Sequence, residues 1–120
     1  MHELSIAQNI LDIVRQNLPP GENVSVTVVR LSIGAMAGVM PDSLEFCFSA
    51  IAEGTPVEGA TLEIEHVPLT VQCAACGRES VIAPVLFACP MCGSTAVTIL
   101  RGRELQVREI EIAGGNGSGP

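Results

Sequence analysis

Apolar residues in the first part of the chain recur at helical spacing. Between residues 4 and 18 they lie three or four positions apart, and polar side chains occupy most positions between them. These apolar residues are Leu4, Ala7, Ile10, Leu11, Val14 and Leu18. The sequence Pro19-Pro20-Gly21 follows, and proline cannot continue a helix because it lacks the backbone N–H. The pattern therefore predicts an amphipathic helix over residues 4–18.

A second helix is predicted to begin near Pro41, because proline suits the first helical position. Asp42 and Glu45 complement the positive end of the helix dipole. Gly54 stands where a helix commonly ends in a C′ glycine. One face of this helix is apolar and consists of Leu44, Cys47, Phe48 and Ile51. On that face, Cys47 is interpreted as a packed core thiol.

Three further segments alternate between apolar and polar residues, as half-buried strands do. Residues 24–33 place Val24, Val26 and Val28 on one side and Ser25, Thr27 and Val29 on the other. Residues 60–68 alternate in the same way, with a slip of phase near Val67. Residues 104–112 change phase near Arg108 and Glu109, which predicts a β-bulge there.

The order of these elements predicts an α+β fold, in which two helices pack on a three-stranded sheet. A cysteine-containing segment interrupts the chain before its last strand. We therefore expect an α+β domain over residues 1–70 plus 102–113. An inserted domain over residues 71–101 resembles a zinc ribbon with four cysteine ligands. The Gly/Asn/Ser-rich residues 114–120 are expected to be a disordered tail.

Charge and composition argue against several classes of function. The net charge is −7, the six basic residues are all scattered arginines, and aromatic residues make up 2% of the chain. Such a chain offers neither a basic stripe to a phosphate backbone nor stacking platforms to single strands, so we expect no nucleic-acid partner. There is no phosphate-binding Gly-x-x-x-x-Gly-Lys motif. No apolar run is long enough to cross a membrane, and no secretion signal is recognised, so a cytoplasmic location is expected.

The strongest chemical signal is a pair of Cys-x-x-Cys motifs with twelve residues between them. The four cysteines are Cys73, Cys76, Cys89 and Cys92. A glycine follows each pair, at Gly77 and Gly93, and permits the positive φ that such a turn needs. Two turns that face each other bring four sulfurs into a tetrahedron, which predicts a closed structural Zn²⁺ site. The alternatives are disulfides, a redox Cys-x-x-Cys pair and an Fe–S cluster.

A second candidate metal site lies at the amino terminus. His2 places an imidazole beside the α-amine and the first backbone amides, and Glu3 follows it. Nitrogen ligands of this kind suit square-planar Ni²⁺ or Cu²⁺. Spacing alone does not choose between these two metals, and the alternative is a Met-His start that has no metal function.

With these motifs, the chain resembles the HypA family of hydrogenase and urease nickel-incorporation metallochaperones. The likeness extends over residues 1–112 and rests on the start Met1-His2-Glu3-Leu4-Ser5, the Ile33-Gly34 loop and the paired cysteine motifs. It implies a nickel-binding domain in which His2 and Glu3 bind transported Ni²⁺ with N-terminal nitrogens. It also implies a zinc-binding domain that holds structural Zn²⁺ with the four cysteines.

The resemblance further implies the partners of the protein. A HypB-type, nucleotide-hydrolysing nickel chaperone would act with this chain, and Ni²⁺ would go to the hydrogenase large subunit, with urease as another client. We also allow a weak homodimer. The chain departs from some relatives because no histidine accompanies its zinc cysteines, which puts a histidine-dependent pH switch in doubt.

Two other functions remain open from the sequence. The first is a zinc-ribbon protein-interaction adaptor without a nickel function. The second is a small metal-dependent hydrolase that uses His2 and a carboxylate, but the sequence shows no ligand triad and no Ser-His-Asp arrangement for it. We therefore expect a binding and delivery protein and not an enzyme.

Overall fold

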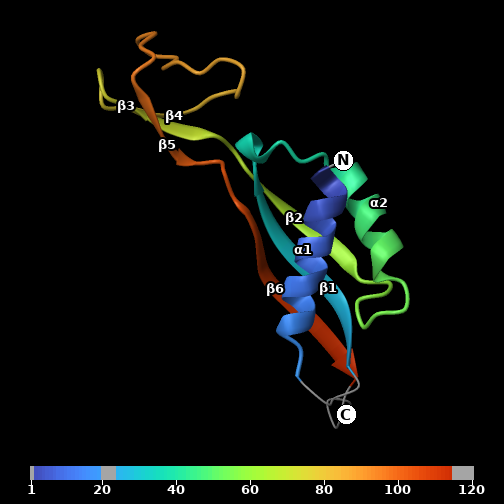
Figure 1. Ribbon diagram of the computed structural model, residues 1–120. Coiled ribbons are helices and arrows are strands. Elements are labelled where there is room, and N and C mark those ends of the chain that lie inside the picture. The colour runs from blue at the N-terminus through green and yellow to red at the C-terminus, as the bar shows by residue number, and fades with distance from the viewer. Residues whose placement is uncertain (1, 20–23, 115–120) are drawn as a thin grey trace. The chain divides into compact units, whose positions relative to one another are not determined.

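The computed structural model describes residues 2–19 and 24–114. Its first part contains helix α1 (His2–Gln16), strand β1 (Val24–Gly34), the 3₁₀ turn η1 (Ala35–Ala37) and helix α2 (Pro41–Ala52). Strands β2 (Thr61–Val67), β3 (Thr70–Cys73), β4 (Glu79–Val81), β5 (Val97–Arg101) and β6 (Leu105–Gly114) follow. The predicted fold class is confirmed: two helices accompany a three-stranded sheet of order β2-β1-β6 (Figure 1).

The chain divides into two compact units. The first unit consists of Met1–Leu31, Val39–Ile64 and Gln106–Pro120, and the second of Ser32–Gly38 and Glu65–Leu105. The assignment of nickel binding to residues 1–70 plus 102–113 and of zinc binding to residues 71–101 stays a prediction. The disordered tail was predicted to begin at residue 114, but Gly114 is the last residue of β6, and residues 115–120 lie outside the described residues. Helix α1 ends at Gln16 and not at the predicted residue 18, and the Pro20-Gly21 part of the predicted break lies outside the described residues as well.

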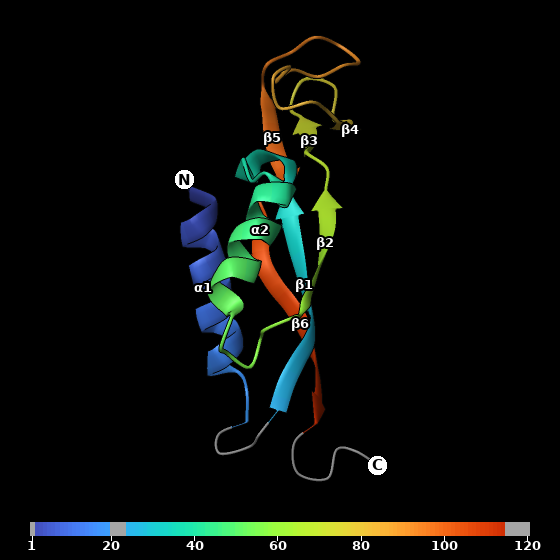
Figure 2. The ribbon, with the colours of Figure 1, turned by 90° about the vertical axis from the view of Figure 1, so that its right-hand side faces the viewer.

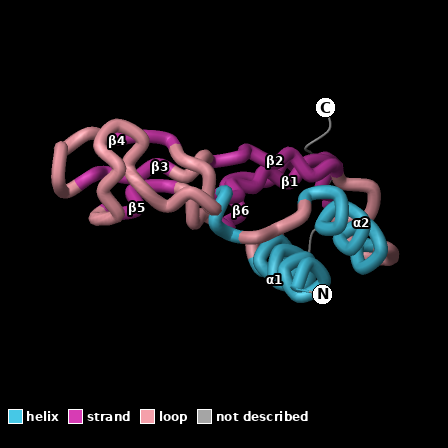
Figure 3. The backbone as a smooth tube through the Cα atoms, turned by 90° about the horizontal axis from the view of Figure 1, so that it is seen from above, coloured by secondary structure: helices cyan, strands magenta, loops and turns pink. Residues whose placement is uncertain are grey.

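Helices α1 and α2 pack against each other over one face of the first sheet, as two views show (Figures 2 and 3). The buried residues of the two helices are Ala7, Ile10, Leu11, Val14, Leu44, Cys47, Phe48 and Ala52. This agrees with the predicted apolar faces except at the ends of each face, where Leu4 is 46% exposed and Ile51 is half-buried. Cys47 is a packed core thiol, as predicted, and Gly54 occupies the C′ position.

Burial along β1 differs from the predicted alternation at Val28, which is half-buried, and at Val29, which is buried. Val24 and Val26 are buried as expected, but the buried positions then shift by one residue to Val29, Leu31 and Ile33. From Leu31 to Gly34 every residue of β1 is buried, so both sides of this part of the strand are covered. The partly exposed Arg30 lies between the buried Val29 and Leu31 and points to the opposite side of the strand from them.

Arg30 joins all three strands of the sheet on that opposite face. Its Nε lies 2.9 Å from Oε1 of Glu63 on β2, and its Nη1 lies 2.6 Å from Oε2 of both Glu109 and Glu111 on β6. The bond to Glu111 and the other carboxylates raise the pKa of Arg30 above its ordinary value. These side chains are exposed or partly exposed, so each pair stabilises the fold weakly. Their arrangement nevertheless favours one register of the three strands.

The cysteine-containing segment has an antiparallel sheet of its own, which the sequence did not reveal. Its order is β4-β3-β5, and Val71 pairs with Ser80 on one side and Ile99 on the other. Leu69, Thr70, Val71 and Cys73 are buried. These strands have three to five residues, and their alternation is too short to be recognised in a sequence.

Within the second unit, the chain after β1 passes very close to the segment between β5 and β6. The N–H of Gly34 donates to the carbonyl of Glu104 at 2.7 Å, and the N–H of Met36 donates to the carbonyl of Gly102 at the same distance. A Cβ atom on Gly34 would overlap the backbone of Gly102 and Arg103. Glycine is needed here because two backbone segments meet where no side chain fits.

Gly34→Ala is therefore expected to destabilise the protein by about 1–3 kcal/mol, the usual cost of overpacking a tight contact. Gly38→Ala is the matched control, since a Cβ there meets no atom within 4 Å and only its φ of 70° opposes the change. We expect a cost of about 1 kcal/mol for that variant. Urea unfolding of both variants measures the difference. Equal stability of the Gly34→Ala variant and the natural protein would contradict the close approach.

Candidate metal sites

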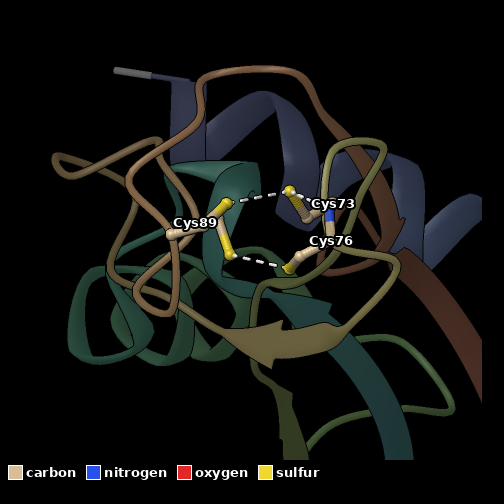
Figure 4. A group of neighbouring side chains, drawn as sticks. Cys73, Cys76 and Cys89 are labelled. Atoms are coloured by element: carbon tan, nitrogen blue, oxygen red, sulfur yellow. Dashed lines mark hydrogen bonds between the residues drawn. The ribbon is translucent and has the colours of Figure 1, made fainter.

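The four cysteines of the paired motifs converge, as predicted. Their Sγ atoms all lie within 4.8 Å of one another. In Figure 4 the sulfurs of Cys73, Cys76 and Cys89 point towards one common centre. The first cysteine of each motif is buried, with exposed fractions of 1% for Cys73 and 2% for Cys89, whereas Cys76 and Cys92 are exposed. The cluster therefore has an inner and an outer pair of sulfurs.

The distances between the sulfurs fit a tetrahedral metal site. Sγ of Cys73 lies 3.6 Å from Sγ of Cys92, and Sγ of Cys76 lies 3.7 Å from Sγ of Cys89. Zinc–sulfur bonds of about 2.3 Å in a tetrahedron place the sulfurs about 3.8 Å apart. A disulfide bond would need a distance of about 2.05 Å. The donor set and its spacing are compatible with a structural metal such as zinc.

The two cysteine turns have the same backbone geometry. In the first, the N–H of Cys73 donates to the carbonyl of Arg78, and the N–H of Gly77 donates to the carbonyl of Cys73. In the second, Cys89 and Gly93 make the same two bonds, with Ser94 as the acceptor for Cys89. The predicted positive φ is present, at 78° for Gly77 and 80° for Gly93. Each turn therefore directs two sulfurs to one side by its backbone alone.

Backbone N–H groups also stabilise thiolates in this cluster. The N–H groups of Cys76 and Ala75 face the sulfur of Cys73 and lower its pKa to about 6. Burial raises the pKa of Cys89, but the N–H groups of Cys92 and Met91 outweigh it and the net shift is downward.

The sulfur of Cys92 behaves in the opposite way. The N–H of Ser94 favours its thiolate, but the negative sulfur of Cys73 and burial prevail, and its pKa rises to about 11. Without a cation, four thiolates so close together repel one another. A divalent cation at the centre removes this repulsion, and full deprotonation of the cluster therefore favours metal binding.

The predicted amino-terminal pair lies in the first turn of α1. Nε2 of His2 lies 3.7 Å from Oε2 of Glu3, and the imidazole is more exposed than the carboxylate, at 55% against 12%. The first N–H groups of a helix have no acceptor within the helix, so the backbone nitrogens of this turn are not needed for helical hydrogen bonds. The predicted third contributor, the α-amine of Met1, lies outside the described residues.

Met40 contacts the start of α1, a contact that was not predicted from the sequence. The N–H of Met40, the residue before α2, donates to Oε2 of Glu3 at 3.2 Å. This bond, together with the charge of His2, holds the pKa of Glu3 below its ordinary value of 4.5. No sequence motif indicates this contact, because the donor is a backbone N–H and does not depend on the residue type. The carboxylate of Glu3 thus joins the start of α1 to the start of α2.

Other candidate residues take no part in either site. Cys47 is packed between the helices, and His66 is exposed on β2. Met91 lies at the surface of the second cysteine turn with an exposed fraction of 59%. In the described ranges 2–19 and 24–114, no helix is both long and apolar enough to cross a membrane.

Comparison with known proteins gives the same family as the motifs. The family model "Hydrogenase/urease nickel incorporation, metallochaperone, hypA" matches residues 1–112. The hydrogenase maturation factor HypA of Streptomyces avermitilis is 48% identical over 109 residues, which are 89% of this chain and 83% of the relative. The factor of the same name from Chloroflexus aggregans is 46% identical over 112 residues, which are 92% of this chain and 98% of the relative.

A solved structure shares the fold. The solution structure of the Ni metallochaperone HypA from Helicobacter pylori matches with a TM-score of 0.62 and covers 92% of this chain and 97% of that one. The sequence identity is 20%, so this likeness shows the fold alone. The family match along residues 1–112 and the two close relatives establish the family. The chain belongs to the HypA family of nickel metallochaperones, which serves the maturation of hydrogenase and urease.

Proposed function

We propose that this chain binds Ni²⁺ at its amino terminus and delivers it for the maturation of a [NiFe] hydrogenase, with urease as another client. Membership of the HypA family over residues 1–112, which include His2 and Glu3, is the observation that carries this proposal. The position of both residues in the first turn of α1 supports it, since this turn offers nitrogen atoms that the helix does not use.

The proposed nickel ligands are nitrogen atoms. The imidazole of His2 is 55% exposed and can meet an incoming ion without rearrangement of the core. The α-amine and the backbone nitrogens up to Glu3 would complete fused chelate rings, which suit square-planar Ni²⁺. The same ligands also suit Cu²⁺, so the choice of cargo depends on the supply of metal as well as on the site.

The carboxylate of Glu3 has a different role in this proposal. Its Oε2 already accepts the N–H of Met40, and its side chain is largely buried. We therefore assign the backbone nitrogen of Glu3 to nickel and the carboxylate to positioning. The carboxylate holds the first turn of α1 beside α2, so the ligands stay at a defined place on the surface.

The four cysteines are proposed to hold Zn²⁺ permanently. Four thiolates and one Zn²⁺ leave no open coordination position, so the ion supplies folding energy to the cysteine turns and no catalysis. The chain's own contribution is the pair of backbone turns that hold the sulfurs 3.6–3.7 Å apart. We propose a delivery function and not an enzymatic one.

Delivery needs partners, and the family indicates which pathway supplies them. The chain has no phosphate-binding loop, so energy from nucleotide hydrolysis has to come from another protein, proposed here as a HypB-type nickel chaperone. The proposed acceptor is the hydrogenase large subunit, and the proposed location is the cytoplasm. The competing function is a zinc-ribbon adaptor without nickel, and one equivalent of Ni²⁺ with a measured stoichiometry separates the two.

Replacement of any one of the four cluster cysteines by Ala is expected to abolish zinc binding and unfold residues 71–101, because the cluster then lacks one of its four ligands. Helices α1 and α2 should persist, since they belong to the other unit and their core contains none of the cluster cysteines. Cys47→Ala is the matched control and should retain one zinc per chain. Elemental analysis and amide NMR spectra measure both. A folded cysteine module with no zinc in the natural protein would overturn the proposal.

A Gly-Ser extension before Met1 is expected to weaken nickel binding by at least tenfold, about 1.4 kcal/mol, because it converts the proposed amine ligand to an amide. His2→Ala should act similarly, whereas His66→Ala, which removes the exposed histidine of β2, should have little effect. Isothermal titration with Ni²⁺ measures the affinity, with zinc content as the control. Undiminished binding by the extended chain would exclude the amine as a ligand.

The tether between Glu3 and Met40 makes a pH-dependent prediction. The pKa of Glu3 is lowered in the folded chain, so its stabilising contribution is present above the ordinary value of 4.5 and is lost as pH falls through the folded pKa. Glu3→Gln should therefore lower the melting temperature at neutral pH, and the difference from the natural protein should vanish in acid. Glu53→Gln, which changes an exposed carboxylate beyond the last turn of α2, is the control. A pH-independent difference would contradict the role of the charge.

A further inference from the structure

The four sulfurs of the cysteine cluster differ in their access to solvent. Cys76 and Cys92, the second cysteine of each turn, are exposed, whereas Cys73 and Cys89 are buried. The zinc ligation proposed above requires all four side chains as thiolates, which is the form of cysteine that oxidants attack. An oxidant in solution therefore reaches the outer sulfur of either turn before it reaches an inner one.

Each exposed sulfur lies against a buried sulfur of the other turn. Sγ of Cys92 is 3.6 Å from Sγ of Cys73, and Sγ of Cys76 is 3.7 Å from Sγ of Cys89 (Figure 4). A disulfide bond is about 2.05 Å long, so bond formation has to bring the two sulfurs of a pair about 1.6 Å closer. These contacts favour disulfides between the two turns over disulfides within one turn.

Backbone hydrogen bonds hold the inner cysteine of each turn without the help of a metal. The N–H of Gly77 donates to the carbonyl of Cys73, and the N–H of Gly93 donates to the carbonyl of Cys89, each at 2.8 Å. Cys73 is also fixed by strand pairing, because it lies opposite Val97 of β5. A disulfide between the turns links them directly and, like a shared metal, restricts the unfolded chain. The module therefore has a way to stay folded when its zinc leaves.

We propose that Cys76 and Cys92 are sites of oxidative modification by a hydroperoxide, and that the buried sulfur beside each of them closes a disulfide between the two turns. The expected bonds are Cys73–Cys92 and Cys76–Cys89, in line with the two sulfur contacts. The proposal rests on the zinc ligation of the proposed function, because zinc holds the four sulfurs as thiolates. Oxidation then exchanges the metal for a covalent link, and a thiol reductant reverses the exchange.

The reaction has two steps, which we describe for the pair of Cys92 and Cys73. The thiolate of Cys92 attacks one peroxide oxygen, so that an S–O bond forms, the O–O bond breaks and an alkoxide or hydroxide leaves. The thiolate of Cys73 then attacks the sulfur of this sulfenic acid, and hydroxide leaves as the S–S bond forms. Two thiolates have lost two electrons, and one hydroperoxide has been reduced. Only two sulfurs then remain as ligands, so zinc is released.

Titration of the zinc-loaded natural protein with hydrogen peroxide tests this. Released zinc is measured with a colorimetric chelator, and disulfides are mapped by mass spectrometry after the remaining thiols are alkylated. We expect loss of the whole zinc content as the two disulfides between the turns form, and its return after reduction and addition of Zn²⁺. Dimedone, which traps sulfenic acids, should label Cys76 and Cys92 and leave Cys73 and Cys89 unlabelled. Amide NMR spectra should still show β3 and β5 in the oxidised protein.

Cys47→Ala is the matched control, because Cys47 is buried in the other unit and should take no part in the reaction. This variant should release zinc and form the same disulfides as the natural protein. Zinc that stays bound, disulfides within one turn, or dimedone on the buried sulfurs would overturn the proposal. Zinc content is measured before peroxide is added, so a natural protein without zinc refutes the metal site of the proposed function. The disulfides mapped in that same sample still decide which sulfurs are modified.

Discussion

Burial of one side of β1 is the constraint on which the first unit depends. The strand lies between β2 and β6, and its apolar residues Val24, Val26, Val29 and Leu31 face a core that contains few aromatic side chains. An aliphatic core must be closely packed, because each small side chain removes only a modest apolar area from water and so stabilises the fold by a modest amount. Val29 and Leu31 are buried, and Arg30 between them points to the other side of the strand, towards Glu63, Glu109 and Glu111.

How well each element can be predicted depends on the length of its residue pattern. The faces of α1 and α2 repeat over three or more turns, so their buried residues were predicted nearly completely. Strand β1 was located correctly, but the burial of Val29 beside a half-buried Val28 was not predicted, because both residues are valines and the sequence does not distinguish them. Strands β3, β4 and β5 are too short to carry a pattern and became visible in the structure alone.

The candidate sites also differ in how far a sequence motif specifies them. The cysteine cluster was predicted completely, because Cys-x-x-Cys-Gly specifies both the ligands and the backbone turn that directs them. The contact between Glu3 and Met40 could not be predicted, since it joins a side chain to a backbone N–H 37 residues away.

The two candidate metal sites differ in coordination chemistry as well as in their position along the chain. The cysteine cluster offers four sulfurs at tetrahedral spacing, two of them buried, and a closed tetrahedron of thiolates suits Zn²⁺. The amino terminus offers nitrogens at an exposed helix start, which would suit the planar Ni²⁺ ion of the proposed function. In that proposal a carrier needs both properties in one chain, since an ion that stabilises the fold must stay when the cargo is released. Two sites that differ in donor atom, shape and access would meet this requirement through their own local chemistry.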